Sequence, residues 1–254
     1  MADQIAQALV QAAHLTAAAC RAARAEGTLS GELPAGPGAV WGGDFADCST
    51  AYPLAAARAL RRPARELAEL LAVRIALGGT FFASVEAAGP GFLNFRLADV
   101  WYEKVLAAAD GLPGTAAKRA PPPLPDREAI RLLLGAEPDA EIDPELPLRR
   151  DRGNPVYRLR YALQRLRRLP EAAEREAELP FSPSEKALIK AIAACLPIGT
   201  EPDLRPAARS LTALADALHA YHTACRRAGC APRRRTLIAA RQALEIGMGT
   251  LGVP

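Results

Sequence analysis

The chain has 254 residues, half of them hydrophobic and 5% aromatic, with 32 Lys and Arg against 28 Asp and Glu and a formal net charge of +4. It is long enough for one large domain or two ordinary ones with a core of normal size. No apolar run reaches the ~18 residues of a membrane span and no signal-peptide pattern opens the chain, so we expect a cytoplasmic protein without a membrane segment.

The first 110 residues are predicted to mix helices with short strands. Apolar residues recur at helical spacing in several stretches, and a Gly/Pro-rich loop is expected over 31–43. Two runs of strand character are joined by a Gly-Pro-Gly turn at 89–91. The predicted elements are helices at 2–24, 49–60, 63–77 and 100–109 and strands at 80–87 and 92–97. We therefore expect an α+β domain over residues 1–110.

The rest of the chain divides into a proline-rich segment and a helical one. Eight prolines between 112 and 147 predict a semi-rigid linker over 111–150, interrupted by a short helix at 126–134. After the linker, the apolar residues recur only at helical spacing. Helices are predicted at 156–169, 184–195, 205–228 and 236–251. Four amphipathic helices in about 100 residues favour a compact all-α bundle over 151–254.

The first helix of that bundle has two different sides. One side carries a stripe of leucines. The other side carries Tyr157, Arg158, Tyr161, Arg165 and Arg168. Arginine and tyrosine without a carboxylate suit phosphate pairing and base stacking at the same site. The alternative interpretation is a basic helix that packs on its leucines and points its arginines at water.

Basic residues gather in two clusters, where a polyanion would bind. Residues 149–168 hold eight arginines against one acid, and a second cluster extends over 226–235. The candidate phosphate contacts are Arg160, Arg167, Arg168, Arg233, Arg234 and Arg235. The five cysteines show no metal-ligand spacing, and His219 and His222 are three residues apart rather than four. We therefore expect no metal, no cofactor and reduced thiols.

Two sets of motifs resemble one family. The segment 154–166, N-P-V-Y-R-L-R-Y-A-L-Q-R-L, is similar to the N-P-V-Y-Y-V-Q-Y-A-H-A-R-I signature that opens the anticodon-binding (DALR) domain of arginyl-tRNA synthetases. The segments 43–46, G-D-F-A, and 89–95, G-P-G-F-L-N-F, resemble motifs of the same enzymes' N-terminal tRNA-core domain. Both occur in the family's order, so the resemblance implies an N-terminal tRNA-core-binding domain and a C-terminal DALR bundle.

The resemblance also implies which residues contact RNA. In the family, the ring and the amide of the second N-terminal motif contact a base of the tRNA D-loop, and Phe92 and Asn94 match them. The alternative is that Phe92 is a core residue and Asn94 a turn amide. The positions that match the anticodon pocket, or stand beside them, are Tyr157, Arg158, Tyr161, Arg165 and Tyr221. The signature's histidine is Leu163 here, which leaves discrimination of anticodon bases open.

The catalytic domain of these enzymes has no counterpart in this sequence. Only residues 98–153 lie between the matched parts, and neither an H-x-G-H motif nor a K-M-S-K-like loop is present. The resemblance therefore implies a non-catalytic relative, of a kind found in high-GC bacteria, that binds tRNA, foremost arginine tRNA, in a regulatory or accessory role. Two alternatives stay open: a protein-interaction module that docks on arginyl-tRNA synthetase, and a non-catalytic subunit of a ligase activity supplied in trans.

Overall fold

The computed structural model describes residues 3–42, 46–112, 123–137, 140–168, 180–196 and 204–253. Its contacts divide the chain into two compact units, residues 2–103 and 104–254. Every described helix is too short or too polar to cross a membrane.

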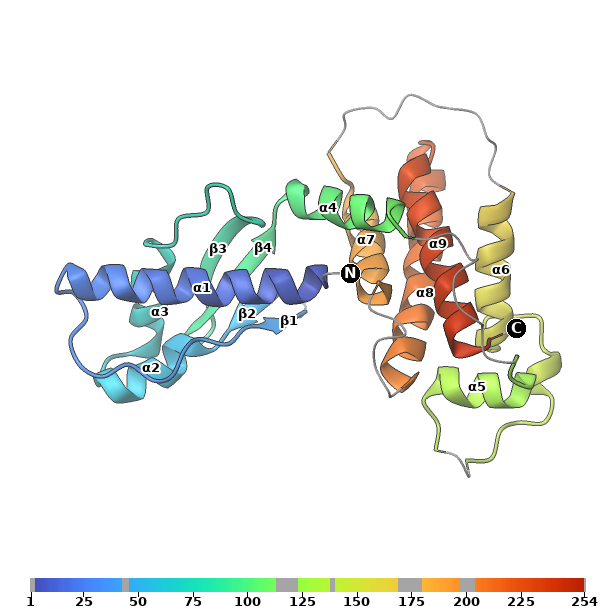
Figure 1. Ribbon diagram of the computed structural model, residues 1–254, viewed down its shortest axis with the longest axis horizontal. Coiled ribbons are helices and arrows are strands. Elements are labelled where there is room, and N and C mark those ends of the chain that lie inside the picture. Colours follow the sequence, from blue (N-terminus) through green and yellow to red (C-terminus); the bar gives the residue numbers. More distant parts are fainter. Residues whose placement is uncertain are drawn as a thin grey trace. The chain divides into compact units, whose positions relative to one another are not determined.

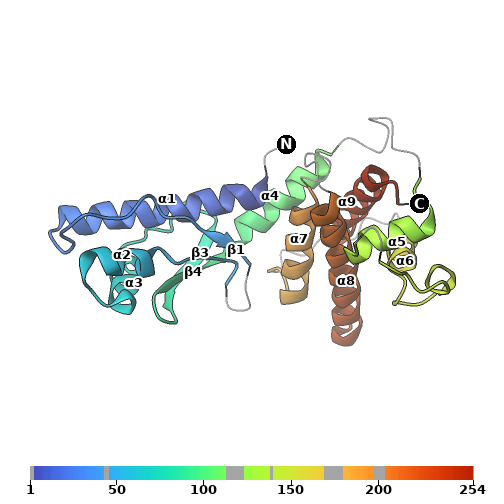
Figure 2. The ribbon, with the colours of Figure 1, turned by 90° about the horizontal axis from the view of Figure 1, so that it is seen from below.

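The first unit is a small antiparallel sheet with helices packed on it (Figures 1 and 2). Its elements are α1 (Gln4–Ala25), β1 (Val40–Trp41), β2 (Cys48–Thr50), α2 (Tyr52–Leu60), α3 (Ala64–Ala72), β3 (Phe82–Ala88) and β4 (Phe92–Leu97). The strand order is β1-β2-β4-β3, and α4 (Asp99–Asp110) follows the last strand. The sheet thus joins strands that lie more than 40 residues apart in the chain, since β2 pairs with β4.

Alternation along β4 divides the sheet into a core face and a polar face. Leu93, Phe95 and Leu97 are buried, with at most 4% of their surface exposed, because they point to the side covered by helices. On the opposite face Phe92 is half-buried and Arg96 is exposed. One face of the sheet therefore supplies the core and the other is available for contacts.

Two predictions of local structure in this unit were wrong. Residues 49 and 50, predicted as the start of a helix over 49–60, belong to strand β2, and Val40–Trp41, predicted as loop, is β1. Both strands are too short to show the alternation of apolar and polar residues by which a strand is recognised in a sequence. They exist because β2 pairs with β4, more than 40 residues away. The helix expected over 63–77 ends at Ala72, where a tighter turn begins with the N–H of Arg74 donating to the carbonyl of Leu71.

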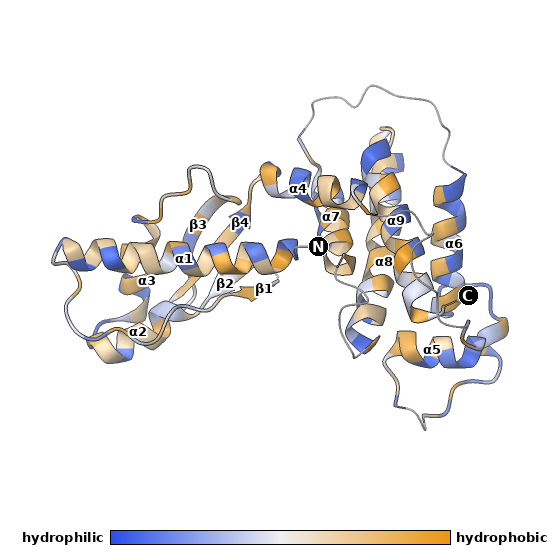
Figure 3. Cartoon of the chain, viewed as in Figure 1, coloured by the Kyte–Doolittle hydropathy of each residue, from blue (hydrophilic) through white to orange (hydrophobic). Residues whose placement is uncertain are grey.

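The second unit is helical in its described residues, as predicted. Its elements are α5 (Asp126–Leu134), a 3-10 turn (Leu146–Leu148), α6 (Pro155–Arg167), α7 (Pro183–Cys195), α8 (Leu204–Ala228) and α9 (Arg234–Leu251). Hydropathy colouring shows α6 as alternating blue and orange bands, as an amphipathic helix requires (Figure 3). Leu159 and Leu166 of α6 are at most 1% exposed, so the leucine side of α6 is part of the core.

Part of the predicted linker packs with the helices. Ala129, Ile130 and Leu133 of α5 are buried, and α5 contacts α6 and α8. The N–H of Leu124 also donates to the carbonyl of Gly252 at 2.7 Å. The helix at 126–134 is thus a member of the helical unit, because three apolar side chains on one side of it need burial. Residues 113–122 and 138–139 of the predicted linker lie outside the described residues, as does most of the 43–46 motif.

Candidate functional site

Helix α6 begins at an asparagine whose side-chain oxygen and nitrogen both form hydrogen bonds. The Asn154 carbonyl oxygen Oδ1 accepts from the N–H groups of Val156 and Tyr157 at 3.0 and 3.1 Å, which caps the helix. Its amide Nδ2 donates to the carbonyls of Pro147 and Arg149 at 3.3 and 3.1 Å. Asn154 is 4% exposed. One buried side chain therefore fixes both the start of α6 and the course of the loop before it.

A cavity of about 400 Å³ lies between α6, α8 and the loop residues 150–152; we call it the α6–α8 cavity. Four of the five residues predicted to contact an anticodon line it together: Tyr157, Arg158, Tyr161 and Arg165. Its volume is within the usual range of small-molecule sites. The structure thus brings these four side chains to one concave site.

The two tyrosines of the cavity form a stacked pair. Tyr157 and Tyr161 are one turn apart on α6, with ring centroids 6.1 Å apart and ring planes inclined by 23°. Half of the Tyr161 surface is exposed. A further planar ring can therefore be added to the pair at Tyr161.

The charges around the cavity are mainly positive. Four arginines line it, at positions 150, 152, 158 and 165, against two carboxylates. The Arg158 guanidinium donates to the Asp216 carboxylate at 3.0 Å, and the Arg152 guanidinium contacts the His219 ring. Asp151 accepts from the N–H of Gly153 at 2.7 Å. The remaining positive charge makes the rim suitable for phosphate groups.

Two histidines of α8, His219 and His222, also line the cavity. His222 is 9% exposed, and among the described residues its Nε2 atom has no hydrogen-bond partner. Burial, together with the charges of Arg165 and His219, lowers the pKa of His222 from 6.5 to about 4. Burial, Arg152, Arg165 and Arg226 also lower the pKa of His219. The imidazole of His222 is therefore neutral at physiological pH. The sequence signal for the burial of His222 is its helical spacing from the apolar residues Ala215 and Leu218, which places the three on one side of α8.

Tyr221 does not line the cavity. It is 3% exposed, and its hydroxyl accepts from the N–H of Arg233 at 2.8 Å. The Arg233 guanidinium lies 4.6 Å from the Phe181 ring and pairs with Glu185 at 3.2 Å. Burial raises the pKa of Tyr221. Tyr221 and Arg233 thus hold the turn between α8 and α9 together and are occupied by protein contacts.

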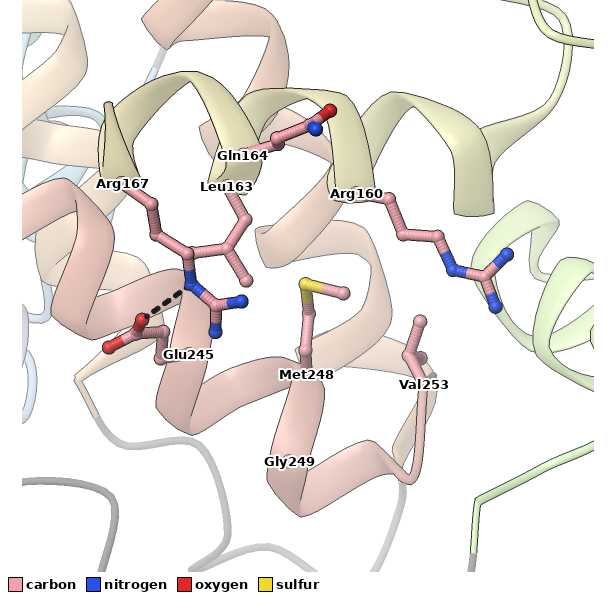
Figure 4. Close-up of a pocket in the computed structure, with 8 residues that line it drawn as sticks. All are labelled: Arg160, Leu163, Gln164, Arg167, Glu245, Met248, Gly249 and Val253. Carbon is pink, nitrogen blue, oxygen red and sulfur yellow. Dashed lines mark hydrogen bonds and ion pairs between the residues drawn. The ribbon is translucent and has the colours of Figure 1, made fainter. Parts of the chain in front are cut away.

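A second cavity of about 530 Å³ lies on the other side of α6, toward α9 (Figure 4). Arg160 and Arg167 line it, with Leu163 and Met248 between them in the view of Figure 4. Arg160 pairs with Asp126 at 3.1 Å and Arg167 with Glu245 at 3.2 Å. These exposed pairs are weak, so a phosphate can compete for either arginine.

The three remaining predicted phosphate contacts lie apart from both cavities. Arg168 and Arg234 are exposed at the ends of α6 and α9. Arg235 pairs with Asp110 at 3.2 Å. The basic cluster at 233–235 is therefore partly committed to contacts within the protein.

The predicted tRNA-core residues lie on the polar face of the sheet. Asn94 stands between Ser49 of β2 and Glu86 of β3, and its Oδ1 accepts from the Ser49 hydroxyl at 2.9 Å. It is 7% exposed, more buried than strand alternation alone indicated. Phe92 is half-buried at the start of β4. Residues Phe92 and Asn94 therefore share a face, as the alternation predicted, but the Asn94 carbonyl oxygen is already engaged.

The turn before Phe92 is held against α3 by a glycine. Gly91 has φ +148°, and a Cβ there would lie 2.7 Å from the Ala64 Cβ and 2.9 Å from its carbonyl carbon. The Arg65 guanidinium also donates to the carbonyl of Gly89 at 3.3 Å. The G-P-G part of the motif thus requires glycine for a close backbone approach.

Comparison with known proteins finds relatives of a part of the first unit. Residues 42–97 match the family model of the arginyl tRNA synthetase N terminal domain. The arginine–tRNA ligase of Acetivibrio thermocellus is 42% identical over 64 residues, 25% of this chain and 11% of that protein. The ligase of Citrifermentans bemidjiense is 37% identical over 91 residues, 34% of this chain and 16% of that protein.

The N-terminal region of this chain is therefore related to that of arginyl-tRNA synthetases, which confirms the predicted resemblance there. The matches span only 11% and 16% of the length of these two relatives. The family match includes β2, β3 and β4 and ends at Leu97, so it lies wholly within the first unit.

Proposed function

We propose that the protein binds tRNA, foremost arginine tRNA, as a relative of arginyl-tRNA synthetase without catalytic function. In this proposal the polar face of the sheet contacts the tRNA core. The helical unit acts as an anticodon-binding bundle of the DALR kind. The observation that carries the proposal is the convergence of Tyr157, Tyr161, Arg158 and Arg165 on the α6–α8 cavity.

The chemistry of that cavity suits a single-stranded RNA loop. Stacking of a base on an aromatic ring contributes about 1–3 kcal/mol per base. Arginines on the rim neutralise phosphates, which makes binding depend steeply on salt. An anticodon loop offers both groups together, because its unstacked bases lie next to their own phosphates.

The proposed role is regulatory or accessory. The sequence contains three histidines and four lysines, and none stands in an H-x-G-H motif or a K-M-S-K-like loop. Such a protein would sense the tRNA pool or compete with the synthetase for tRNA. Docking on the synthetase through protein contacts is the alternative, and a complex that survives nuclease treatment would favour it.

Filter binding across purified tRNA species at two salt concentrations tests the proposal. We expect binding that is strongest for arginine tRNA, weakens with salt, and falls at least tenfold when Tyr161 and Arg165 are both replaced by alanine. Arg127→Ala, an exposed arginine of α5 outside both cavities, is the matched control. Absence of binding at low salt, or equal binding by the double variant, would overturn the proposal.

A further inference from the structure

The α6–α8 cavity contains a buried polar atom that the described protein does not satisfy. His222 is more than nine-tenths buried and lines the cavity, and its Nε2 atom lacks a partner among the described residues. Buried polar groups are nearly always hydrogen-bonded, so each exception needs an explanation. A ligand that supplies the missing partner explains this one.

We propose that the α6–α8 cavity takes one unstacked nucleobase and that His222 reads its edge by a hydrogen bond. The inference rests on the proposed function and specifies which side chain discriminates the base. Tyr161 provides the stacking plane, and the arginines of the rim hold the flanking phosphate. His222 then meets the polar edge of the stacked base.

His222 differs from the charged groups of the cavity in what it can offer. The guanidiniums of Arg152, Arg158 and Arg165 donate hydrogen bonds and accept none, and Asp151 and Asp216 only accept. A neutral imidazole presents one donor and one acceptor nitrogen, so in a given tautomer its Nε2 atom pairs with only one kind of group on a base edge. The low pKa of His222 keeps it neutral. His222 is therefore suited to distinguish bases by the pattern of groups on their edges.

The unpaired Nε2 atom can be turned toward a ligand without movement of the helix. The second side-chain torsion of histidine is broad, so the ring can rotate within its site. The neighbouring His219 ring is held by the Arg152 guanidinium and lies 3.4 Å from the Thr223 hydroxyl. It is therefore already engaged in contacts, whereas the Nε2 of His222 has no hydrogen-bond partner among the described residues.

Binding of short RNAs by the full-length protein tests the inference. The probes are the heptanucleotides of adenosine, cytidine and uridine and an abasic heptamer of the same backbone. We expect the dissociation constants of the wild-type protein for the strongest-binding and the weakest-binding of the three heptanucleotides to differ at least tenfold. His222→Phe keeps an aromatic ring at this position and removes both nitrogens. We expect the three dissociation constants of this variant to lie within about twofold of one another.

The design separates this inference from the proposed function. Binding of the abasic heptamer should be equal in wild type and His222→Phe, because phosphate contacts are untouched. His222→Gln should retain a ranking, since an amide both donates and accepts. His14→Phe, an exposed histidine of the first unit, is the matched control. An unchanged ranking in His222→Phe, or no ranking in the wild type, overturns the inference while tRNA binding stands. If the wild-type protein binds neither the heptamers nor tRNA at low salt, the proposed function itself is overturned.

Discussion

Tyr157 and Tyr161 lie on the same side of α6 with their rings 6.1 Å apart and nearly parallel, and both line the α6–α8 cavity. The i, i+4 spacing brings the rings together, since residues four apart are neighbours on a helix. The packing of α6 against α8 places the pair at the cavity. Its free ring face is the basis of the first prediction.

Replacing Tyr161 by alanine should weaken RNA binding by about 1–3 kcal/mol, or roughly 5- to 150-fold, because one stacking plane is lost. Tyr161→Phe keeps the plane and should bind within about twofold of wild type. The measurement is the dissociation constant for arginine tRNA at fixed salt. Equal weakening by both variants would assign the effect to the hydroxyl and contradict the stacking role.

Replacing Asn154 by alanine should destabilise the protein by about 1–2 kcal/mol, since a buried helix cap is lost. Asn154→Asp retains the acceptor for the N–H groups of Val156 and Tyr157 but cannot donate to the carbonyls of Pro147 and Arg149. Urea unfolding should place Asn154→Asp between wild type and Asn154→Ala. RNA binding should fall in both variants, because the loop that lines the α6–α8 cavity loses its anchor.

The stability of the wild-type protein should decline between pH 6.5 and pH 4 because of His222. The folded protein binds a proton at His222 less readily than the unfolded chain, since the pKa of His222 is lowered to about 4. This contribution is complete above pH 6.5 and is lost as pH falls toward 4, amounting to about 3 kcal/mol at most.

The His222→Phe variant isolates that contribution. Its unfolding free energy relative to wild type should rise by roughly 2–3 kcal/mol between pH 7 and pH 4, measured by urea titration at both values. The carboxylates titrate in both proteins, so their effect cancels in the difference. A pH-independent difference would show that His222 is not buried in its neutral form.

Replacing Gly91 by alanine should destabilise the first unit by about 2–3 kcal/mol. The added Cβ would meet the backbone of Ala64, and φ +148° is unfavourable for any other residue. Gly36→Ala is the control, because a Cβ there meets nothing within 4 Å. Comparable thermal unfolding of the two variants would contradict the close approach of this turn to α3.

Local sequence patterns were sufficient to predict many of the helices and strands. The helical spacing of apolar residues predicted the helices α6 to α9 of the second unit, and alternation around the turn at 89–91 predicted β3 and β4. The strands β1 and β2 could not be predicted in this way. They are two and three residues long. Strand β1 pairs only with the short β2, whose other partner, β4, is distant in the sequence.

The sequence by itself determined that Tyr157, Arg158, Tyr161 and Arg165 lie on one side of α6, because helical geometry depends only on spacing. The tertiary structure alone decided what they face. One residue along a helix is a rotation of about 100°, so Tyr221 turns into the core while His222 turns toward α6. That orientation depends on how α8 packs against α6, which are about 50 residues apart in the chain.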